Sequence, residues 1–162
     1  MNPYTQPIDV ETLFRLQAAQ YQVVLPLEQT IPALSEVNAR IDITTLGHFM
    51  MQSFTGSYTT KILDGQDPTD DGINHLSIKM LDGSNNRTLF EDYIPASLIL
   101  SPGREKILPA VGNDSEPLRL EYSFIYTFAM NGAIQVNIKN DSDYENILKM
   151  AFKGIRIFPM DR

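Results

Sequence analysis

The side chains best suited to chemistry in this chain are aspartates, and four of them lie between Asp64 and Asp71. Clustered carboxylates are typical of calcium loops, in which about six to eight oxygens at defined spacing bind the ion. Pro68 interrupts this stretch, and the alternating aspartates that should lead to a Gly are missing. We therefore interpret Asp64 to Asp71 as an exposed loop between strands. Weak binding of calcium or of a sugar at this loop stays open as an alternative.

A second acidic group, Asp141, Asp143 and Glu145, has the spacing with which a helix–loop–helix calcium site begins. Such a loop needs Gly at its sixth position and a bidentate Glu at its end. The sequence has Asn146 and Phe152 at those two places. We interpret the group as a turn.

The chain has two histidines, His48 and His75, which could share a metal ion with an aspartate. His48 lies in an apolar stretch, so a partly buried structural role is the simpler interpretation. The Gly-x-Ser-x-Gly pattern of serine hydrolases and a Gly-rich phosphate loop are both absent from the sequence. Paired carboxylates for glycoside cleavage stay open, because their separation is set by the fold. The sequence thus predicts no catalytic, cofactor-binding or metal-binding residues, and no enzyme.

The amino-acid composition limits which partners the protein can bind and in which compartment it is expected. A chain of 162 residues is long enough for one domain with a sizeable core. The absence of cysteine excludes disulfides and thiolate zinc sites, and fits a reducing compartment. A net charge of −7 without a basic cluster argues against nucleic-acid binding. No apolar run approaches the ~18 residues of a membrane span, and the N-terminus does not resemble a secretory signal. We expect a protein that is made in the cytoplasm and kept there until assembly, without membrane contact.

The elements that must position these side chains are strands, and the clearest lie in the C-terminal third. From Leu118 to Met130 aromatic and aliphatic residues alternate with mostly polar ones, which is the period of a half-buried strand. We expect its rings to fill the core between two sheets, with an exposed sugar-stacking platform as the alternative; the rings are Tyr122, Phe124, Tyr126 and Phe128.

Two further runs follow this strand. Asn131-Gly132 predicts a turn, and a second alternating run covers Ile134 to Lys139. The third run begins at Leu148, and its parity slips at Gly154, which suggests a β-bulge. Three long strands with short connections predict an antiparallel meander.

The N-terminal 22 residues are expected to form an arm with one short helix. Asp9 can cap the helix, and Phe14, Ala18 and Tyr21 follow one another at helical spacing. Two interpretations are open: the helix packs across its own domain, or it docks on a neighbouring subunit.

Residues 23–162 are expected to form one β-sandwich domain. Pro26 predicts an edge strand around Val23 to Leu27, and Asp82-Gly83 predicts a hairpin turn. The other expected segments are strands at Arg40–Thr44, Leu46–Met51, Phe54–Thr60, Leu76–Leu81 and Leu89–Phe90, and an irregular crossover from Ile94 to Gly103. Eight or nine strands at this spacing predict an all-β fold, an antiparallel, jelly-roll-like β-sandwich with one short N-terminal helix.

The order of several short motifs resembles a group of small β-sandwich structural proteins of bacteriophage virions. The motifs are Leu25-Pro26-Leu27, Ile41-Asp42-Ile43, Phe54 to Thr60, Leu76 to Gly83, Ile94-Pro95, Ile107-Leu108-Pro109, Ile138 to Ser142 and Lys153 to Arg156. The resemblance covers most of the chain; the acidic Asp64–Asp71 loop and the N-terminal arm depart from it.

This resemblance implies a non-enzymatic virion component, such as a minor capsid, decoration or connector-associated protein. It implies a homo-oligomer that contacts capsid, vertex or tail proteins, is assembled in the host cytoplasm and is located in the virion. The family has no catalytic residues to transfer to this chain.

Two other classes of function compete with that expectation. A carbohydrate- or receptor-binding sandwich would need exposed aromatic rings beside acidic or amide side chains, for which Tyr58 and Tyr93 are the candidates. A hydrolase would need carboxylates that come together only in the folded chain.

Overall fold

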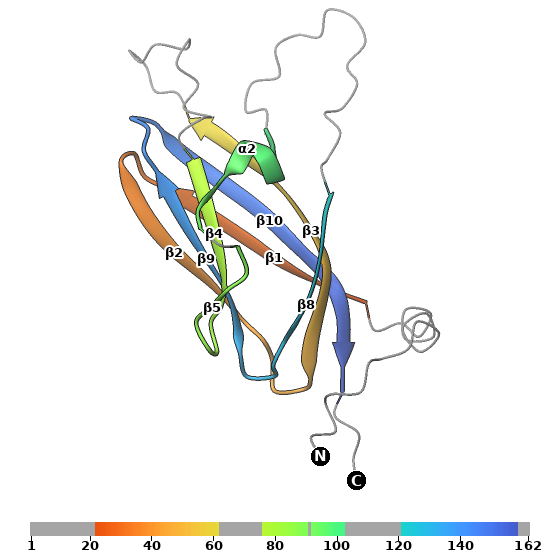
Figure 1. Ribbon diagram of the computed structural model, residues 1–162. Helices are drawn as coiled ribbons and strands as arrows, with labels where there is room; N and C mark the ends of the chain where they lie inside the picture. The colour runs from red at the N-terminus through yellow and green to blue at the C-terminus, as the bar shows by residue number, and fades with distance from the viewer. Residues whose placement is uncertain (1–21, 62–75, 91, 103–120, 159–162) are drawn as a thin grey trace, which may run out of the picture.

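Two packed β-sheets make up the computed structural model, which describes residues 22–61, 76–90, 92–102 and 121–158 (Figure 1). The first sheet has the strand order β1, β10, β3, with β7 and β8 both pairing with β3. The second has the order β2, β9, β4, with β5 and β6 both pairing with β4. The all-β sandwich predicted from the sequence is therefore confirmed.

The strand bounds show that a few long strands carry the fold. The strands of the first sheet are β1 (Gln22–Ile31), β3 (His48–Lys61), β7 (Ser101–Pro102), β8 (Glu121–Phe128) and β10 (Glu145–Ile157). Those of the second sheet are β2 (Ser35–Asp42), β4 (Leu76–Asp82), β5 (Arg87–Thr88), β6 (Ile94–Pro95) and β9 (Ala133–Asn140). All pairings are antiparallel except the short one between β3 and β7.

The predicted C-terminal meander is wrong. Strand β8 pairs with β3, β9 lies between β2 and β4, and β10 lies between β1 and β3, so successive strands belong to opposite sheets. Asn131, at φ 60°, and Gly132 do form the turn after β8. That turn is hydrogen-bonded to the β2–β3 connection, Ile43 N–H to Gly132 C=O at 2.9 Å and Asn131 N–H to Thr44 C=O at 3.4 Å. It therefore carries the chain across the sandwich instead of back along β8.

The core between the sheets follows the predicted alternation. On the inner faces of β4, β9 and β10 every second side chain is apolar and at most 4% exposed: Leu76, Ile78, Met80, Ile134, Val136, Ile138, Leu148, Met150 and Phe152. Each such side chain contributes roughly 1.5–3 kcal/mol to folding on burial.

The strand at Leu118–Met130 is only partly a core strand. Phe128 is fully buried, and Phe124 and Tyr126 pack against the core, but Tyr122 is 41% exposed. The reason is position, because β8 lies at an edge of the first sheet and pairs with β3 alone among the described strands. Tyr122 still stacks on Phe54, with ring centroids 5.2 Å apart.

The predicted edge strand and hairpin are confirmed. Among the described strands, β1, which contains Pro26, pairs with β10 alone. Strands β4 and β5 are joined by the turn that starts at Asp82-Gly83. The predicted strand at Leu89–Phe90 is wrong in position, because the strand residues are Arg87 and Thr88. Leu89 adds one more backbone hydrogen bond to β4, to Met80 C=O at 2.8 Å. Phe90 instead packs its ring against Phe54 and Phe124, at 6.2 Å and 5.9 Å between centroids.

The crossover from Ile94 contains one unpredicted helical turn, α2 (Ala96–Ile99), whose Ala96 and Ile99 are buried. No helix in the described ranges is long and apolar enough to cross a membrane. The predicted N-terminal arm and helix, the Asp64–Asp71 loop, His75 and the motif at Ile107–Pro109 lie outside the described residues.

The irregularity predicted at Gly154 is confirmed, although the additional residue lies on the partner strand. Ser53 pairs with Lys153 and Met51 with Gly154, so Gln52 has no counterpart on β10. Gly154 is required here, because a Cβ at this position would lie 2.1 Å from the carbonyl oxygen of Met50. The same Gln52 stands opposite two residues of β8, Phe124 and Ile125.

We predict that Gly154→Ala lowers the free energy of unfolding by roughly 3 kcal/mol, because the methyl group collides with backbone that cannot move aside. Gly83→Ala is the matched control, since its nearest neighbour is the Ala133 Cβ at 3.1 Å, where a small shift suffices. Denaturant unfolding of both variants checks this. Equal losses in the two variants would contradict the assigned clash.

Candidate interaction surface

Two polar side chains hold the ends of the sandwich, Asn140 at one end and His48 at the other. At one end, Asn140 is 1% exposed and closes the turn after β9. Its Nδ2 donates to the carbonyls of Pro32 at 3.0 Å and Tyr144 at 2.7 Å, with Ile31 C=O at 3.4 Å. Its Oδ1 accepts from the backbone N–H and hydroxyl of Ser142, at 3.1 and 2.7 Å. This amide joins the β1–β2 and β9–β10 connections.

The acidic group beside Asn140 forms the predicted turn. The carboxylate of Asp141 pairs with Lys139 at 3.4 Å, and that of Glu145 pairs with Lys61 at 3.4 Å. The two side chains therefore engage different lysines. Within the described ranges, no three His, Asp or Glu side chains gather closely enough to hold a metal ion.

His48 lies at the opposite end of the sandwich, where β3 begins. Its Nδ1 accepts a hydrogen bond from the backbone N–H of Met130 at 3.2 Å. The imidazole thus ties the β8–β9 turn to the start of β3. This contact agrees with the structural role predicted for His48.

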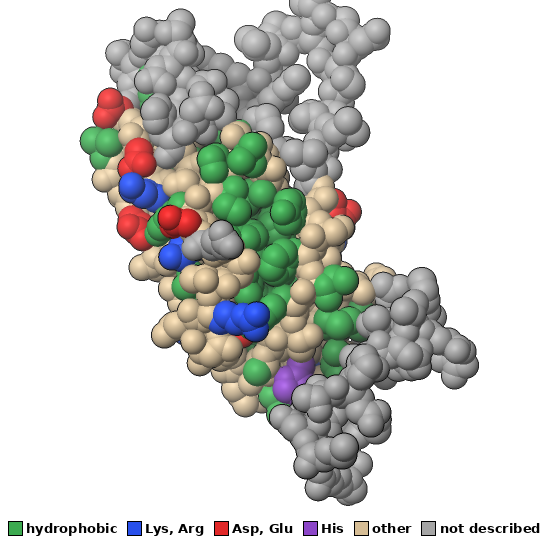
Figure 2. All heavy atoms as spheres, viewed as in Figure 1, with side chains coloured by type: hydrophobic (Ala, Val, Ile, Leu, Met, Phe, Trp, Pro, Cys, Tyr) green, Lys and Arg blue, Asp and Glu red, His purple; other side chains and the backbone are tan. Residues whose placement is uncertain are grey.

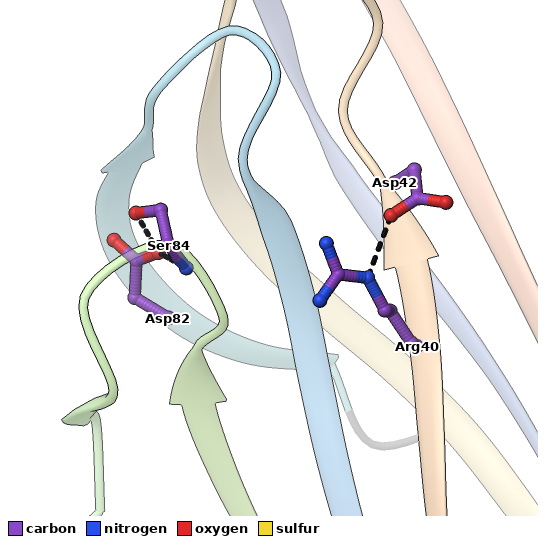
Figure 3. A network of polar contacts seen from close by, with 4 residues as sticks. All are labelled: Arg40, Asp42, Asp82 and Ser84. Carbon is purple, nitrogen blue, oxygen red and sulfur yellow. Dashed lines mark hydrogen bonds and ion pairs between the residues drawn. The ribbon is translucent and has the colours of Figure 1, made fainter.

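Sequence reasoning missed the role of Asp82, which it treated only as a turn residue. Asp82 is 3% exposed, and its Oδ1 accepts from the backbone N–H and hydroxyl of Ser84 at 2.9 and 2.6 Å (Figure 3). Its Oδ2 accepts from the hydroxyl of Tyr126 at 2.8 Å. Burial, with this hydrogen bond and charge, raises the pKa of Tyr126. The buried carboxylate therefore fastens the β4–β5 hairpin to the edge strand β8.

A tyrosine lies on the outer face of the second sheet, among polar side chains. The hydroxyl of Tyr93 donates to Glu36 at 2.5 Å, and the Lys79 ammonium lies 5.8 Å from the ring centroid. Partial burial first, and then the Glu36 carboxylate, raise the pKa of Tyr93 to about 12. Arg40 and Asp42 form an ion pair at 2.7 Å on the same sheet (Figure 3).

The two tyrosines proposed as sugar contacts differ in burial. Tyr58 is 3% exposed and belongs to the core, so that part of the prediction is wrong. Tyr93 is half-buried and lies at the surface. The parity of β3 explains the difference, because Tyr58 points toward the second sheet together with Phe54.

Apolar side chains are exposed at the β8 edge of the sandwich. Ile125 is 77% exposed and Tyr122 is 41% exposed, and we call these two residues the β8 edge surface. Figure 2 shows a continuous stripe of hydrophobic side chains between β4 and β8. The rings of Phe90 and Phe124 meet edge to face, with centroids 5.9 Å apart. Exposed apolar side chains on an edge strand are a feature that many protein–protein contact sites share.

We predict that Asn140→Asp lowers the free energy of unfolding by about 3 kcal/mol, because it places an acceptor where the amide donates to carbonyls. Asn38→Asp, on an exposed position of β2, is the matched control and should be nearly neutral. Thermal and denaturant unfolding give the comparison. A nearly neutral Asn140→Asp would show that the amide donors contribute little.

Alkaline titration tests the Tyr93–Glu36 contact. Because the folded pKa lies above the ordinary value, this contact stabilises the protein below about pH 10 and its contribution is lost as the pH rises toward 12. Glu36→Gln should lower the pKa of Tyr93, seen by ultraviolet difference titration with Tyr93→Phe as the assignment reference. Glu28→Gln, on the other sheet, should leave the titration unchanged. Coincident curves for the Glu36→Gln variant and the parent would refute the coupling.

Comparison with known proteins assigns no function to these surfaces. No family model matches this chain, and no curated protein matches it. The function of its surfaces is therefore inferred from the exposure, charge and hydrogen bonds of their side chains.

Proposed function

We propose that this chain is a non-enzymatic structural protein of a bacteriophage virion that works through protein–protein contacts. The observation that carries the proposal is the β8 edge surface, where an edge strand of the first sheet exposes apolar side chains to solvent. The partners would be further copies of the chain and neighbouring capsid, vertex or tail proteins.

The geometry of β8 suits association with another chain. Its one side is hydrogen-bonded to β3, and no described strand pairs with its other side. An edge strand offers backbone donors and acceptors to an added strand, and exposed apolar side chains give the contact its energy. Ile125 supplies such a side chain.

The polar networks support the same function by making the scaffold rigid. The connections and the β4–β5 hairpin are held by side-chain hydrogen bonds of Asn140, Asp82 and His48. A packing subunit needs surfaces that keep their shape when neighbours bind, because ordering them on binding would cost affinity.

A carbohydrate-binding module is the second candidate, and Tyr93 favours it. A half-buried ring beside the carboxylate of Glu36 and the ammonium of Lys79 combines an apolar face with polar groups. A glycan array with the parent chain and Tyr93→Ala separates the candidates. Saturable sugar binding that Tyr93→Ala abolishes would favour this second function over the first.

The direct test of virion location is mass spectrometry of banded particles from the phage whose genome encodes the chain. We expect the protein in intact particles at a fixed copy number relative to the major capsid protein. Abundant protein in the infected lysate that is missing from the particles would overturn the proposal.

We predict that Ile125→Lys weakens self-association at least about tenfold, because a hot-spot apolar side chain is replaced by a charge. Ser123→Lys, at another exposed position of β8, is the control for added charge and should have a smaller effect. Light scattering after size exclusion across a dilution series measures both. A parent chain that is monomeric at every concentration would contradict the homo-oligomer.

A further inference from the structure

The turn that joins β1 to β2 holds a leucine in a backbone conformation that leucine rarely adopts. Three residues other than glycine have a positive φ in the described ranges, Leu34 at 49°, Asn86 at 57° and Asn131 at 60°. Asparagine is common in this left-handed region, whereas a bulky apolar residue is an outlier there. The conformation brings the Cβ of Leu34 close to the following carbonyl oxygen, so it lowers the stability of the fold.

Hydrogen bonds on both sides of Leu34 keep the turn in this conformation. The N–H of Leu34 donates to the carbonyl of Ser142 at 2.9 Å. The carbonyl of Pro32 accepts from the hydroxyl of Ser35 at 2.7 Å and from Nδ2 of Asn140 at 3.0 Å. The main chain is therefore bonded to the β9–β10 connection, and it cannot relax to relieve the strain at Leu34.

The side chain of Leu34 does not contribute to the packing of the described residues. It is 69% exposed and belongs neither to the core cluster nor to the apolar residues that pack against it. One exposed leucine is ordinary, but Leu34 combines exposure with a strained main chain. Glycine would avoid the strain, and a polar side chain would avoid the contact of apolar atoms with water. The fold alone therefore gives no reason for a leucine at this position.

The two residues before Leu34 extend the apolar surface. Pro32 and Ala33 are also exposed, and we call the three successive residues Pro32, Ala33 and Leu34 the apolar tip. The apolar tip follows β1, which is separated from β8 by β10 and β3 in the first sheet. It is therefore a different surface from the β8 edge surface.

The charges beside the apolar tip indicate the kind of partner that fits it. Ser142, which accepts the hydrogen bond of Leu34, lies between Asp141 and Asp143, and both aspartates are exposed. Two copies of the chain that met tip to tip would bring these carboxylates together, and like charges across an interface are unfavourable. The net charge of the whole chain is −7, which also favours a basic partner over a second copy.

We propose that the apolar tip is a second docking surface, which inserts Leu34 into an apolar pocket with a basic rim on a neighbouring virion protein that is not a copy of this chain. The inference rests on the proposed virion function and adds the chemistry of one partner. A tip that is already rigid loses little conformational freedom on binding, so its strain is offset by a lower cost of association.

Unfolding measurements test whether Leu34 serves the fold. Leu34→Gly and Leu34→Asn should raise the denaturant midpoint or leave it unchanged, because both residues tolerate a positive φ. Leu34→Ala should have the midpoint of the parent, because it keeps the strain and removes only exposed atoms. A clear fall of the midpoint with Leu34→Ala would show that the side chain packs within its own chain, and would overturn the proposal.

Incorporation into particles tests the docking role. The gene is removed from the phage, each variant is supplied from a plasmid at limiting expression, and mass spectrometry of banded particles gives the copy number. Leu34→Ala should lower the copy number at least about tenfold, because a hot-spot side chain is lost, and Leu34→Met should retain it. Leu46→Ala is the matched control and should have no effect, since Leu46 is 61% exposed without a positive φ.

A charge reversal tests the basic rim. The side chain of Asp141 is 55% exposed, and Asp141→Lys should also lower the copy number, because it places a cation against the basic rim. An unchanged or higher copy number would refute a basic partner.

The outcomes separate this inference from the proposed function. If the parent and Leu34→Ala enter particles at the same copy number, the docking role of the apolar tip is wrong and the virion function stands. If the parent is missing from the particles, the virion function is wrong, and so is the partner assigned to the tip. If Leu34→Ala weakens self-association of the purified protein in light scattering, the tip contacts another copy, which refutes a partner of different sequence.

Discussion

The sandwich depends on satisfying backbone hydrogen bonds where the chain passes from one sheet to the other. All four described connections between long strands make this passage: β1–β2, β2–β3, β8–β9 and β9–β10. At each end two of them are joined, Leu34 N–H to Ser142 C=O at one end and Ile43 N–H to Gly132 C=O at the other, both at 2.9 Å. Buried backbone groups without partners are costly, so these bonds fix how the two sheets are connected.

Polar side chains complete these joints. Asn140 and His48 close opposite ends, and Asp82 holds the hairpin to β8. A polar side chain buried in this way stabilises the fold only while every partner is present. The buried positions of Asn140 and Asp82 are thus explained by the connections and the hairpin that these two side chains hold together.

The sequence predicted the strands well because a period of two is a local property. The inner residues of β4 and β9 and the edge position of β1 could all be identified from alternation and from Pro26. It did not predict pairing, because alternation is the same whether the next strand lies alongside or in the other sheet. The meander from β8 to β10 was wrong for this reason.

Most of the surface features depend on contacts between distant residues, which local patterns do not encode. Tyr93 meets Glu36 across 57 positions, and Tyr126 meets Asp82 across 44. Tyr58 and Tyr93 looked equivalent as sequence, yet only the parity of β3 decides that Tyr58 is internal. The two-residue strands and α2 carry no periodic signal at all.

The two sheets present different outer surfaces. The second carries Tyr93 and the Arg40–Asp42 ion pair among hydrogen-bonded polar groups. The first carries the Lys149–Glu28 and Lys153–Glu121 ion pairs, and its β8 edge exposes Ile125. Exposed ion pairs therefore occur on both sheets, and the exposed Ile125 distinguishes the β8 edge of the first.

The irregular pairing around Gln52 has a consequence for how this fold can diverge. Lys153 and Gly154 are adjacent on β10. Their partners on β3, Ser53 and Met51, are separated by one residue, and the partners of those two on β8, Ser123 and Tyr126, are separated by two. The number of unpaired residues thus increases from β10 to the edge strand β8, whereas the register between β10 and β1 has no shift. Related chains could gain or lose residues in β8 without shifting the inner strands, so the segment around Ile125 is where lineage-specific variation can accumulate at the least structural expense.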